Sequence, residues 1–260
     1  MPGPWRIAWL LPLVLGAAPA LAQPCEGRYP LPTPLPADLS GTSFSNVWGR
    51  ANISAMPQGA GLRVRYPAGS INPGHADAPV GGAGFLWAAG QAPEARCVSY
   101  QIRFSEGFDF ALGGKLPGLA GGEVPRGCNA ADLSRGFSAR LMWRPLGEGE
   151  LYLYALDRAA RCGDSIGRGA WRFAPMQWAE IAQEVILNRP GEANGVVRIW
   201  VNGRRVVERT NLVLREDPAI RISGVLFSTF FGGNDRRWAS PRDQWADFAQ
   251  LTLWDANPAP

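Results

Sequence analysis

The fold is decided by residues 137–156, which read FSARLMWRPLGEGELYLYAL. Apolar and polar side chains alternate in 137–144 and again in 150–156, and the residues between them contain one proline and two glycines. This pattern is typical of two antiparallel strands joined by a turn. Because successive side chains of a strand point to opposite faces, one face of the hairpin is apolar and suits a core. It carries Phe137, Ala139, Leu141 and Trp143.

The opposite face of the hairpin carries cationic and phenolic side chains. A turn that is symmetric about Gly147 would place Arg140 opposite Tyr154, and Met142 opposite Tyr152. Ser138 would then share one sheet surface with Arg140 and the two tyrosines, within cross-strand reach. A guanidinium beside a phenol favours the ionised phenolate, so this surface is suited to acid–base chemistry. The alternative is an ordinary solvated face on which an arginine stacks on a tyrosine.

The remainder of the chain indicates an all-β fold. Short apolar or alternating runs are separated by Gly, Pro, Asn and Asp, and they lie at 62–66, 98–104, 196–201, 204–208 and 248–254. Asn202-Gly203 between two of these runs is a strong hairpin signal. We find no internal repeat and no second domain. We therefore predict one sandwich or jelly roll over residues 43–257.

The N-terminal part predicts export. Arg6 precedes a short apolar run at 7–15, and Ala20-Leu21-Ala22 is a small-residue cleavage site, so residues 1–22 are typical of a signal peptide. Residues 23–42 contain five prolines and are predicted to form an extended arm. We expect a secreted or periplasmic protein that is not attached to a membrane after cleavage, and that is a monomer.

The cysteines fit an exported protein. Cys25, Cys97, Cys128 and Cys162 allow three pairings. Cys128 precedes Gly147 by about as many residues as Cys162 follows it, so both emerge at the open end of the hairpin. We therefore predict a Cys128–Cys162 bond, which leaves Cys25–Cys97 to hold the arm.

Charge and residue counts narrow the chemistry. Without Arg6 the chain has 25 basic and 22 acidic residues, a difference of +3, which is too small to predict nucleic-acid binding. His75, in a turn-like stretch, is the only histidine, so neither a zinc site nor a histidine-based triad is predicted. No cofactor fingerprint and no metal-ligand cluster is visible, although calcium held by loop oxygens leaves little sequence signal.

One lysine stands among 25 arginines. Lys115 lies in Gly113-Gly114-Lys115-Leu116-Pro117-Gly118, between two strand-like segments. An ammonium group is a compact charge whose pKa can fall towards neutrality, which a guanidinium does not readily do. The alternative is that arginine is simply favoured by the composition and that Lys115 has no special role.

Several blocks resemble the family 14 polysaccharide lyases. The most specific are 108–110, 113–118 and 121–122 as one block, and 136–144 as the next, with Tyr152-Leu153-Tyr154 following. Further similarity lies at 187–191, 200–203 and 227–233, so the resemblance covers about 44–254. It implies a concanavalin A-like jelly roll of two antiparallel sheets, with a cleft over the concave sheet. It also implies cleavage of uronic-acid polymers, alginate or glucuronan, by β-elimination at O4.

The resemblance implies five catalytic residues: Lys115, Ser138, Arg140, Tyr152 and Tyr154. In our hypothesis Arg140 neutralises the substrate carboxylate, Ser138 orients the sugar, and one tyrosine acts as base and acid. Lys115 lowers a tyrosine pKa, neutralises the carboxylate or is itself the base.

Three further residues are candidates for substrate binding: Arg144, Ser228 and Phe230. For 228–231, a core strand that ends in a glycine turn is an equal alternative to a cleft lining. Asp235 to Trp238 is interpreted as a solvated loop, and Trp143 and Trp254 as core residues.

Two other functions remain open at this point. A retaining glycoside hydrolase needs two carboxylates close together. Glu148 and Glu150 belong to the hairpin loop and are interpreted as solvated turn charges. The other alternative is a non-catalytic, lectin-like protein that binds sugars through its aromatic residues.

Overall fold

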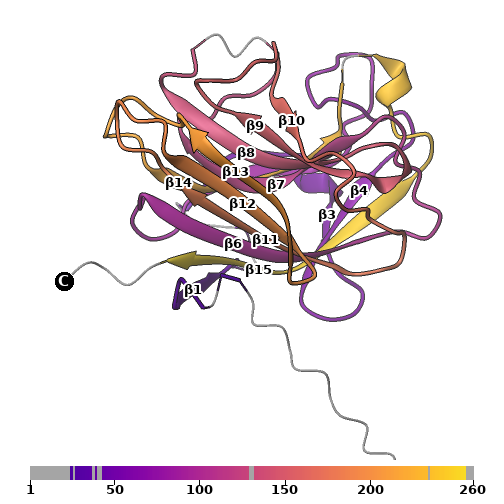
Figure 1. Ribbon diagram of the computed structural model, residues 1–260. Helices are drawn as coiled ribbons and strands as arrows, with labels where there is room; N and C mark the ends of the chain where they lie inside the picture. Colours follow the sequence, from indigo (N-terminus) through magenta and orange to yellow (C-terminus); the bar gives the residue numbers. More distant parts are fainter. Residues whose placement is uncertain are drawn as a thin grey trace, which may run out of the picture.

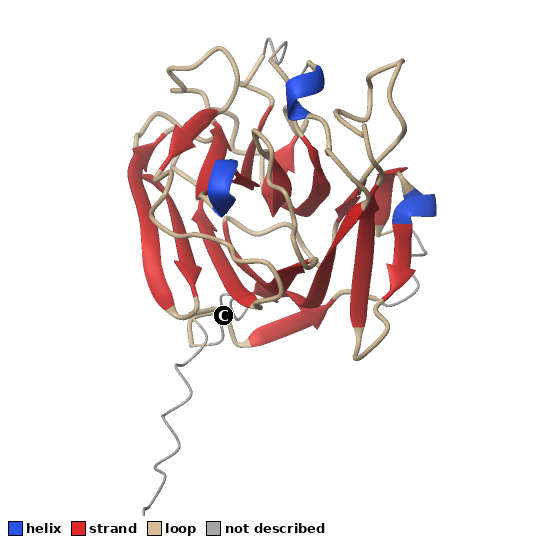
Figure 2. Ribbon diagram, turned by 90° about the vertical axis from the view of Figure 1, so that its right-hand side faces the viewer, coloured by secondary structure: helices blue, strands red, loops and turns tan. Residues whose placement is uncertain are grey.

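Two antiparallel β-sheets pack face to face in the computed structural model of the chain (Figures 1 and 2). The structure describes residues 24–25, 27–36, 39, 43–128, 132–233 and 235–255. The predicted signal peptide lies outside these residues. The predicted all-β jelly-roll architecture is confirmed. No helix in the described part of the chain is long and apolar enough to cross a bilayer.

The seven-stranded sheet contains the predicted hairpin, next to its central strand β7. Its strand order is β10 (Asp164–Ile166), β9 (Gly149–Tyr154), β8 (Gly136–Trp143), β7 (Gly114–Gly122), β14 (Ile222–Phe231), β5 (Ala83–Trp87) and β2 (Phe44–Trp48). Lys115 therefore lies inside a strand, β7, and not between two strands as the sequence suggested. Hydrogen bonding to both β8 and β14 holds the backbone of this residue.

The eight-stranded sheet covers the other side of the core. Its order is β13 (Arg204–Leu212), β12 (Gly195–Val201), β11 (Ala179–Ile186), β6 (Ala95–Phe104), β15 (Gln244–Asp255), β4 (Gly61–Tyr66) and β3 (Ile53–Ala55). In the proline-rich arm, β1 (Leu31–Pro34) pairs with β15 (Figure 1). The predicted hairpin at Asn202-Gly203 joins β12 to β13, and both turn residues have positive φ. Short 3-10 turns occur at η1 (Arg50–Asn52), η2 (Pro145–Gly147) and η3 (Arg236–Trp238).

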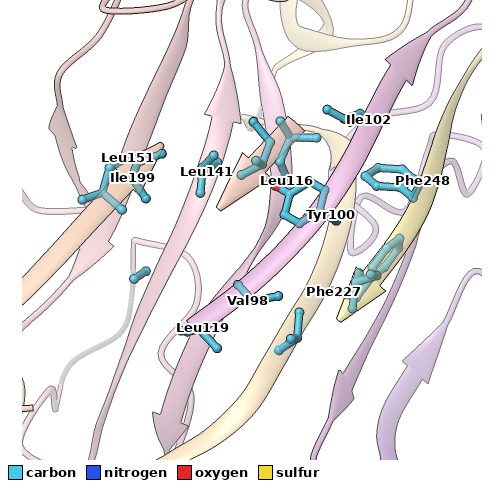
Figure 3. Close-up of a cluster of buried hydrophobic side chains, with 14 of the residues drawn as sticks. Val98, Tyr100, Ile102, Leu116, Leu119, Leu141, Leu151, Ile199, Phe227 and Phe248 are labelled. Atoms are coloured by element: carbon cyan, nitrogen blue, oxygen red, sulfur yellow. The ribbon is translucent and has the colours of Figure 1, made fainter. Parts of the chain in front are cut away.

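The core lies between the two sheets. Figure 3 shows Leu116, Leu141 and Phe227 of the seven-stranded sheet facing side chains of the eight-stranded sheet. The four residues predicted to form the apolar face of the hairpin are fully buried here. Truncation of such a large buried side chain to alanine costs about 3–5 kcal/mol. Trp143 thus fills the core as predicted, whereas Trp254 is only half-buried and donates a hydrogen bond to Ser99 Oγ.

The register of the hairpin differs by two residues from the prediction. Arg140 pairs with Tyr152, and Ser138 pairs with Tyr154. The loop is centred on Leu146, not Gly147, because the Arg144 N–H donates to the Glu148 carbonyl and closes a tight turn. Leu146 adopts φ 60° within this turn, which the sequence did not indicate. A shift of two residues leaves every side chain on its predicted face.

Both predicted disulfides are confirmed. Cys25 bonds to Cys97 and so ties the arm to β6. Cys128 bonds to Cys162 at the open end of the hairpin, and their Cα atoms are 4.3 Å apart.

Candidate active site

A cavity of about 570 Å³ lies over the outer face of the seven-stranded sheet. We call it the cleft cavity. Side chains of β7, β8, β9 and β14 line it because they sit at alternate positions that point away from the core. The end of β2, η3 and several loops contribute the rest. The lining residues used below are Trp48, Lys115, Arg126, Arg140, Met142, Arg144, Tyr152, Tyr154, Ser228, Phe230 and Trp238.

Strand register brings the lysine to the tyrosines. Lys115 pairs with Met142 across β7 and β8, and its Nζ lies 3.0 Å from the Met142 sulfur. The same Nζ lies 4.3 Å from the ring centroid of Tyr152, which is cation–π distance. The amine, a guanidinium and two phenols therefore converge on one surface; the hairpin predicted this for the guanidinium and the phenols, and the family resemblance implied it for the amine. Four of the five candidate catalytic residues line the cleft cavity.

The cleft cavity is strongly cationic. Lys115, Arg126, Arg140 and Arg144 line it, and no Asp or Glu is among its described lining residues. Burial lowers the pKa of Lys115 well below its usual value; Arg140 and Arg144 lower it further, and Glu150 opposes them. This environment suits a negatively charged ligand.

Arg140 is a buried cation without a counter-ion among the described residues. Its exposed fraction is 2%, and its Nε has no hydrogen-bond partner in the described chain. Burial lowers the pKa of Arg140 to about 10. An uncompensated charge of this kind is unfavourable unless a ligand supplies the opposite charge.

The two tyrosines have different surroundings. The Tyr154 hydroxyl donates to the Gly127 carbonyl at 3.1 Å, whereas the Tyr152 ring lies under the amine of Lys115. Burial, followed by the proximity of Tyr152, raises the pKa of Tyr154. Arg140 acts in the opposite direction but does not overcome burial. Arg140 thus favours the phenolate of Tyr154 as expected, but burial outweighs this effect, and the pKa of Tyr154 is raised overall.

Ser138 is the one candidate catalytic residue that does not reach the cleft cavity. It is fully buried, and its hydroxyl donates to the Pro125 carbonyl at 3.2 Å. The segment around Pro125 covers it, which the strand pattern alone did not reveal. In this structure Ser138 supports that segment and does not line the cleft cavity.

The block 228–231 divides between cleft and core. Ser228 and Phe230 line the cleft cavity, and Phe230 packs edge-to-face on Trp48 at 5.9 Å between ring centroids. Thr229 and Phe231 are buried on the core side. The cleft-lining interpretation thus holds for Ser228 and Phe230, and the core-strand interpretation holds for Thr229 and Phe231, because successive side chains of the strand point to opposite faces.

Glu150 was interpreted wrongly as a solvated turn charge. It is fully buried, and its carboxylate accepts from Arg144 Nε at 2.8 Å and from the Ser165 hydroxyl. The signal was present in the sequence, since Glu150 has the same parity as Tyr152 and Tyr154 along the strand. Glu148 does lie at the turn, where it forms surface ion pairs with two arginines.

Three cleft residues were missed because they come from segments outside the hairpin and the Lys115 block: the end of β2, a loop, and η3. Trp48, Arg126 and Trp238 line the cleft cavity. Trp238 belongs to the loop that we interpreted as solvated, and its ring lies 5.7 Å from the Arg144 guanidinium carbon. His75 is partly exposed in a turn, where its Nδ1 accepts the Asp77 N–H.

The Cys128–Cys162 disulfide also lines the cleft cavity. It joins two segments that both bond to Tyr154, one through the Gly127 carbonyl and one through the backbone of Gly163. A Cβ atom at Gly163 would lie 2.8 Å from the Tyr154 ring and 2.9 Å from the Tyr152 ring. Glycine is therefore needed for this close approach.

Comparison with known proteins identifies related chains. The family model described as "Polysaccharide lyase 14" matches residues 55–251. The crystal structure of the PL-14 alginate lyase from Aplysia kurodai is 31% identical, with a TM-score of 0.70 over 82% of this chain and 91% of that one. A Chlorella virus alginate lyase is 23% identical, with a TM-score of 0.69 over 86% and 98% of the two chains. An endo-β-1,4-glucuronan lyase from Trichoderma reesei shares the fold at 11% identity, with a TM-score of 0.55 over 83% and 92%. A search of curated protein sequences found no match.

Proposed function

This chain belongs to polysaccharide lyase family 14 and is a polysaccharide lyase, and we propose that it cleaves uronic-acid polymers, alginate or glucuronan, by β-elimination. The observation that carries the proposal is the uncompensated guanidinium of Arg140 beside Lys115 and Tyr152 in a cavity lined by cations. A polymer with one carboxylate per sugar supplies the missing negative charges. The similarity to an Aplysia alginate lyase supports alginate as one such polymer.

Elimination requires three events at one sugar. The carboxylate must be neutralised, the C5 proton must be removed, and the departing O4 must gain a proton. The electron pair of the C5–H bond forms the C4=C5 double bond as the C4–O4 bond breaks. We assign the first event to Arg140, because a preorganised cation stabilises the negative charge that develops on the carboxylate when C5 loses its proton.

We assign removal of the C5 proton to Lys115. Burial and two neighbouring arginines lower its pKa, so a neutral amine forms closer to working pH than in an ordinary lysine. Tyr152 is the candidate donor to O4, since its ring contacts the amine and it lines the cleft cavity. The hydroxyl of Tyr154 is bonded to Gly127, so we give Tyr154 the role of holding Tyr152 through its edge-to-face contact.

We also propose that the protein acts outside the cytoplasm. Its two disulfides persist in oxidising compartments, which agrees with the signal peptide predicted from the sequence.

The test uses purified mature protein with polymannuronate, polyguluronate and glucuronan as separate substrates. We expect ultraviolet absorbance from unsaturated ends with at least one polymer, and no signal with the same polymer after its carboxylates are reduced to alcohols. New reducing ends without absorbance would indicate hydrolysis instead, and binding without either product would indicate a lectin-like protein.

A further inference from the structure

Glu150 is the only carboxylate in contact with the lysine and arginine network of the cleft cavity within the described chain. It occupies the same cross-strand row as Lys115, because Lys115 pairs with Met142 and Met142 pairs with Glu150. Its side chain is fully buried beneath the lining residues. Burying a carboxylate costs free energy unless its oxygens accept hydrogen bonds. The groups that bond to Glu150 therefore indicate the role of its side chain.

Those partners come from the elements on either side. Arg144, just after β8, donates from Nε at 2.8 Å and approaches with Nη2 at 2.7 Å, so two nitrogens of its guanidinium contact the same carboxylate oxygen, Oε1. Ser165, on the edge strand β10, donates its hydroxyl to the other oxygen. The guanidinium of Arg144 is thereby fixed in the cleft wall, where its other neighbour is the ring of Trp238.

The charges around Lys115 come from several elements. Arg140 is on β8, Arg144 follows β8, and Glu150 and Tyr152 are on β9. The residues of β14 that line the cavity, Ser228 and Phe230, are uncharged, and Arg126 comes from a loop. Without Glu150 every ionised group in this set would be cationic at neutral pH.

We propose that Glu150 is a positioning residue of the lyase site, which anchors Arg144 in the cleft wall and offsets the positive charge around Lys115. It does not line the cavity, so it acts through Arg144 and Lys115 and does not touch the substrate. The proposal deepens the function above and rests on it for its catalytic meaning. The contacts themselves are independent of which polymer is cut.

The protonation of Lys115 can be measured directly because Lys115 is the only lysine of the chain. Protein grown with ¹³C-lysine gives one side-chain signal, whose identity is confirmed by its loss in Lys115→Arg. Titration of this signal by NMR reports the protonation of the amine. Because Glu150 raises the pKa of Lys115, we expect Glu150→Gln to move the titration midpoint to lower pH.

Glu148→Gln is the matched control. Glu148 lies two residues before Glu150, in the turn that precedes β9, but its ion pairs with Arg168 and Arg172 are at the surface. The titration midpoint of Lys115 in Glu148→Gln should equal that in the wild type. A Glu150→Gln midpoint equal to that of Glu148→Gln, or moved to higher pH, would overturn the proposal.

A double variant, Arg144→Gln with Glu150→Gln, guards against loss of folding. Removing both members of a buried pair leaves no uncompensated charge, so this protein should fold even if the single variant does not. We expect its midpoint to return towards that of the wild type, since Arg144 and Glu150 act on Lys115 in opposite directions. If the double variant is unfolded like the single one, charge compensation is not the role of Glu150.

The same variants separate this inference from the proposed function. NMR titration needs no turnover, so it tests the role of Glu150 even if none of the three polymers is cleaved. Where cleavage is observed, the limb of the kcat/KM profile that reports Lys115 should move to lower pH in Glu150→Gln and stay in place in Glu148→Gln. A purely structural role would lower activity at all pH values without moving that limb.

Discussion

Removal of the Cys128–Cys162 disulfide should impair catalysis beyond its effect on stability. The bond closes a loop with a sequence separation of 34 residues, and the chain-entropy relation gives about 4 kcal/mol of stabilisation for a loop of this size. It also joins the two segments that bond to Tyr154. The hydrogen bond from Tyr154 to Gly127 contributes about 1 kcal/mol, and loss of that contact in the reacting complex corresponds to about a fivefold fall in rate.

The second disulfide is the matched control for this experiment. Cys25–Cys97 has a separation of 72 residues, for which the same relation again gives about 4 kcal/mol. It lies in a small cluster with Tyr29, apart from the cleft cavity. The two double Cys→Ala variants should therefore lose similar stability, but only Cys128→Ala/Cys162→Ala should lose kcat/KM.

Two measurements are needed for each variant. Urea unfolding gives the free energy of unfolding, and the unsaturated-product assay, run where both variants are fully folded, gives kcat/KM. Equal loss of kcat/KM in the two folded variants would refute the reasoning, and so would unchanged kcat/KM in the folded Cys128→Ala/Cys162→Ala protein.

Four other changes separate the roles of the cleft residues. Lys115→Arg keeps the positive charge but removes the titrating amine, so kcat/KM should fall at least about 100-fold in the product assay; full activity on every polymer that wild type cleaves would exclude Lys115 as the base. Arg140→Met should reduce kcat by about 100-fold to 1,000-fold because the developing charge loses its stabilising cation, and a change in KM alone would contradict this role. Gly163→Ala should displace the rings of Tyr152 and Tyr154, cost about 1–3 kcal/mol in urea unfolding and lower kcat; unchanged kcat would show that the loop absorbs the methyl group. Lys115→Met should be more stable than wild type at neutral pH. The wild type gains stability as pH rises from the lowered pKa of Lys115 towards the unfolded value of about 10.4, so the difference should shrink over that window in unfolding measurements at each pH.

Side-chain alternation made much of the site predictable. It assigned Phe137 and Leu141 to the core and Arg140 and Tyr152 to the opposite face, since the two-residue period of a strand is a local property of the chain. The position of the turn also predicted the cysteine pairing correctly. These conclusions survive the two-residue error in register, because such a shift does not exchange the faces.

Tertiary structure decided which side chains on that face are exposed and what surrounds them. Ser138 and Arg140 have the same parity, yet the segment around Pro125 covers Ser138 while Arg140 reaches the cleft cavity. The left-handed conformation of Leu146 set the register of the hairpin. Leucine does not favour this conformation, so the residue type gave no sign of it. Burial of Glu150 required Arg144 and the edge strand at Ser165 on either side of it. The alternation within one strand fixes a direction, whereas burial and pKa depend on neighbours contributed by strands and loops far away in the chain.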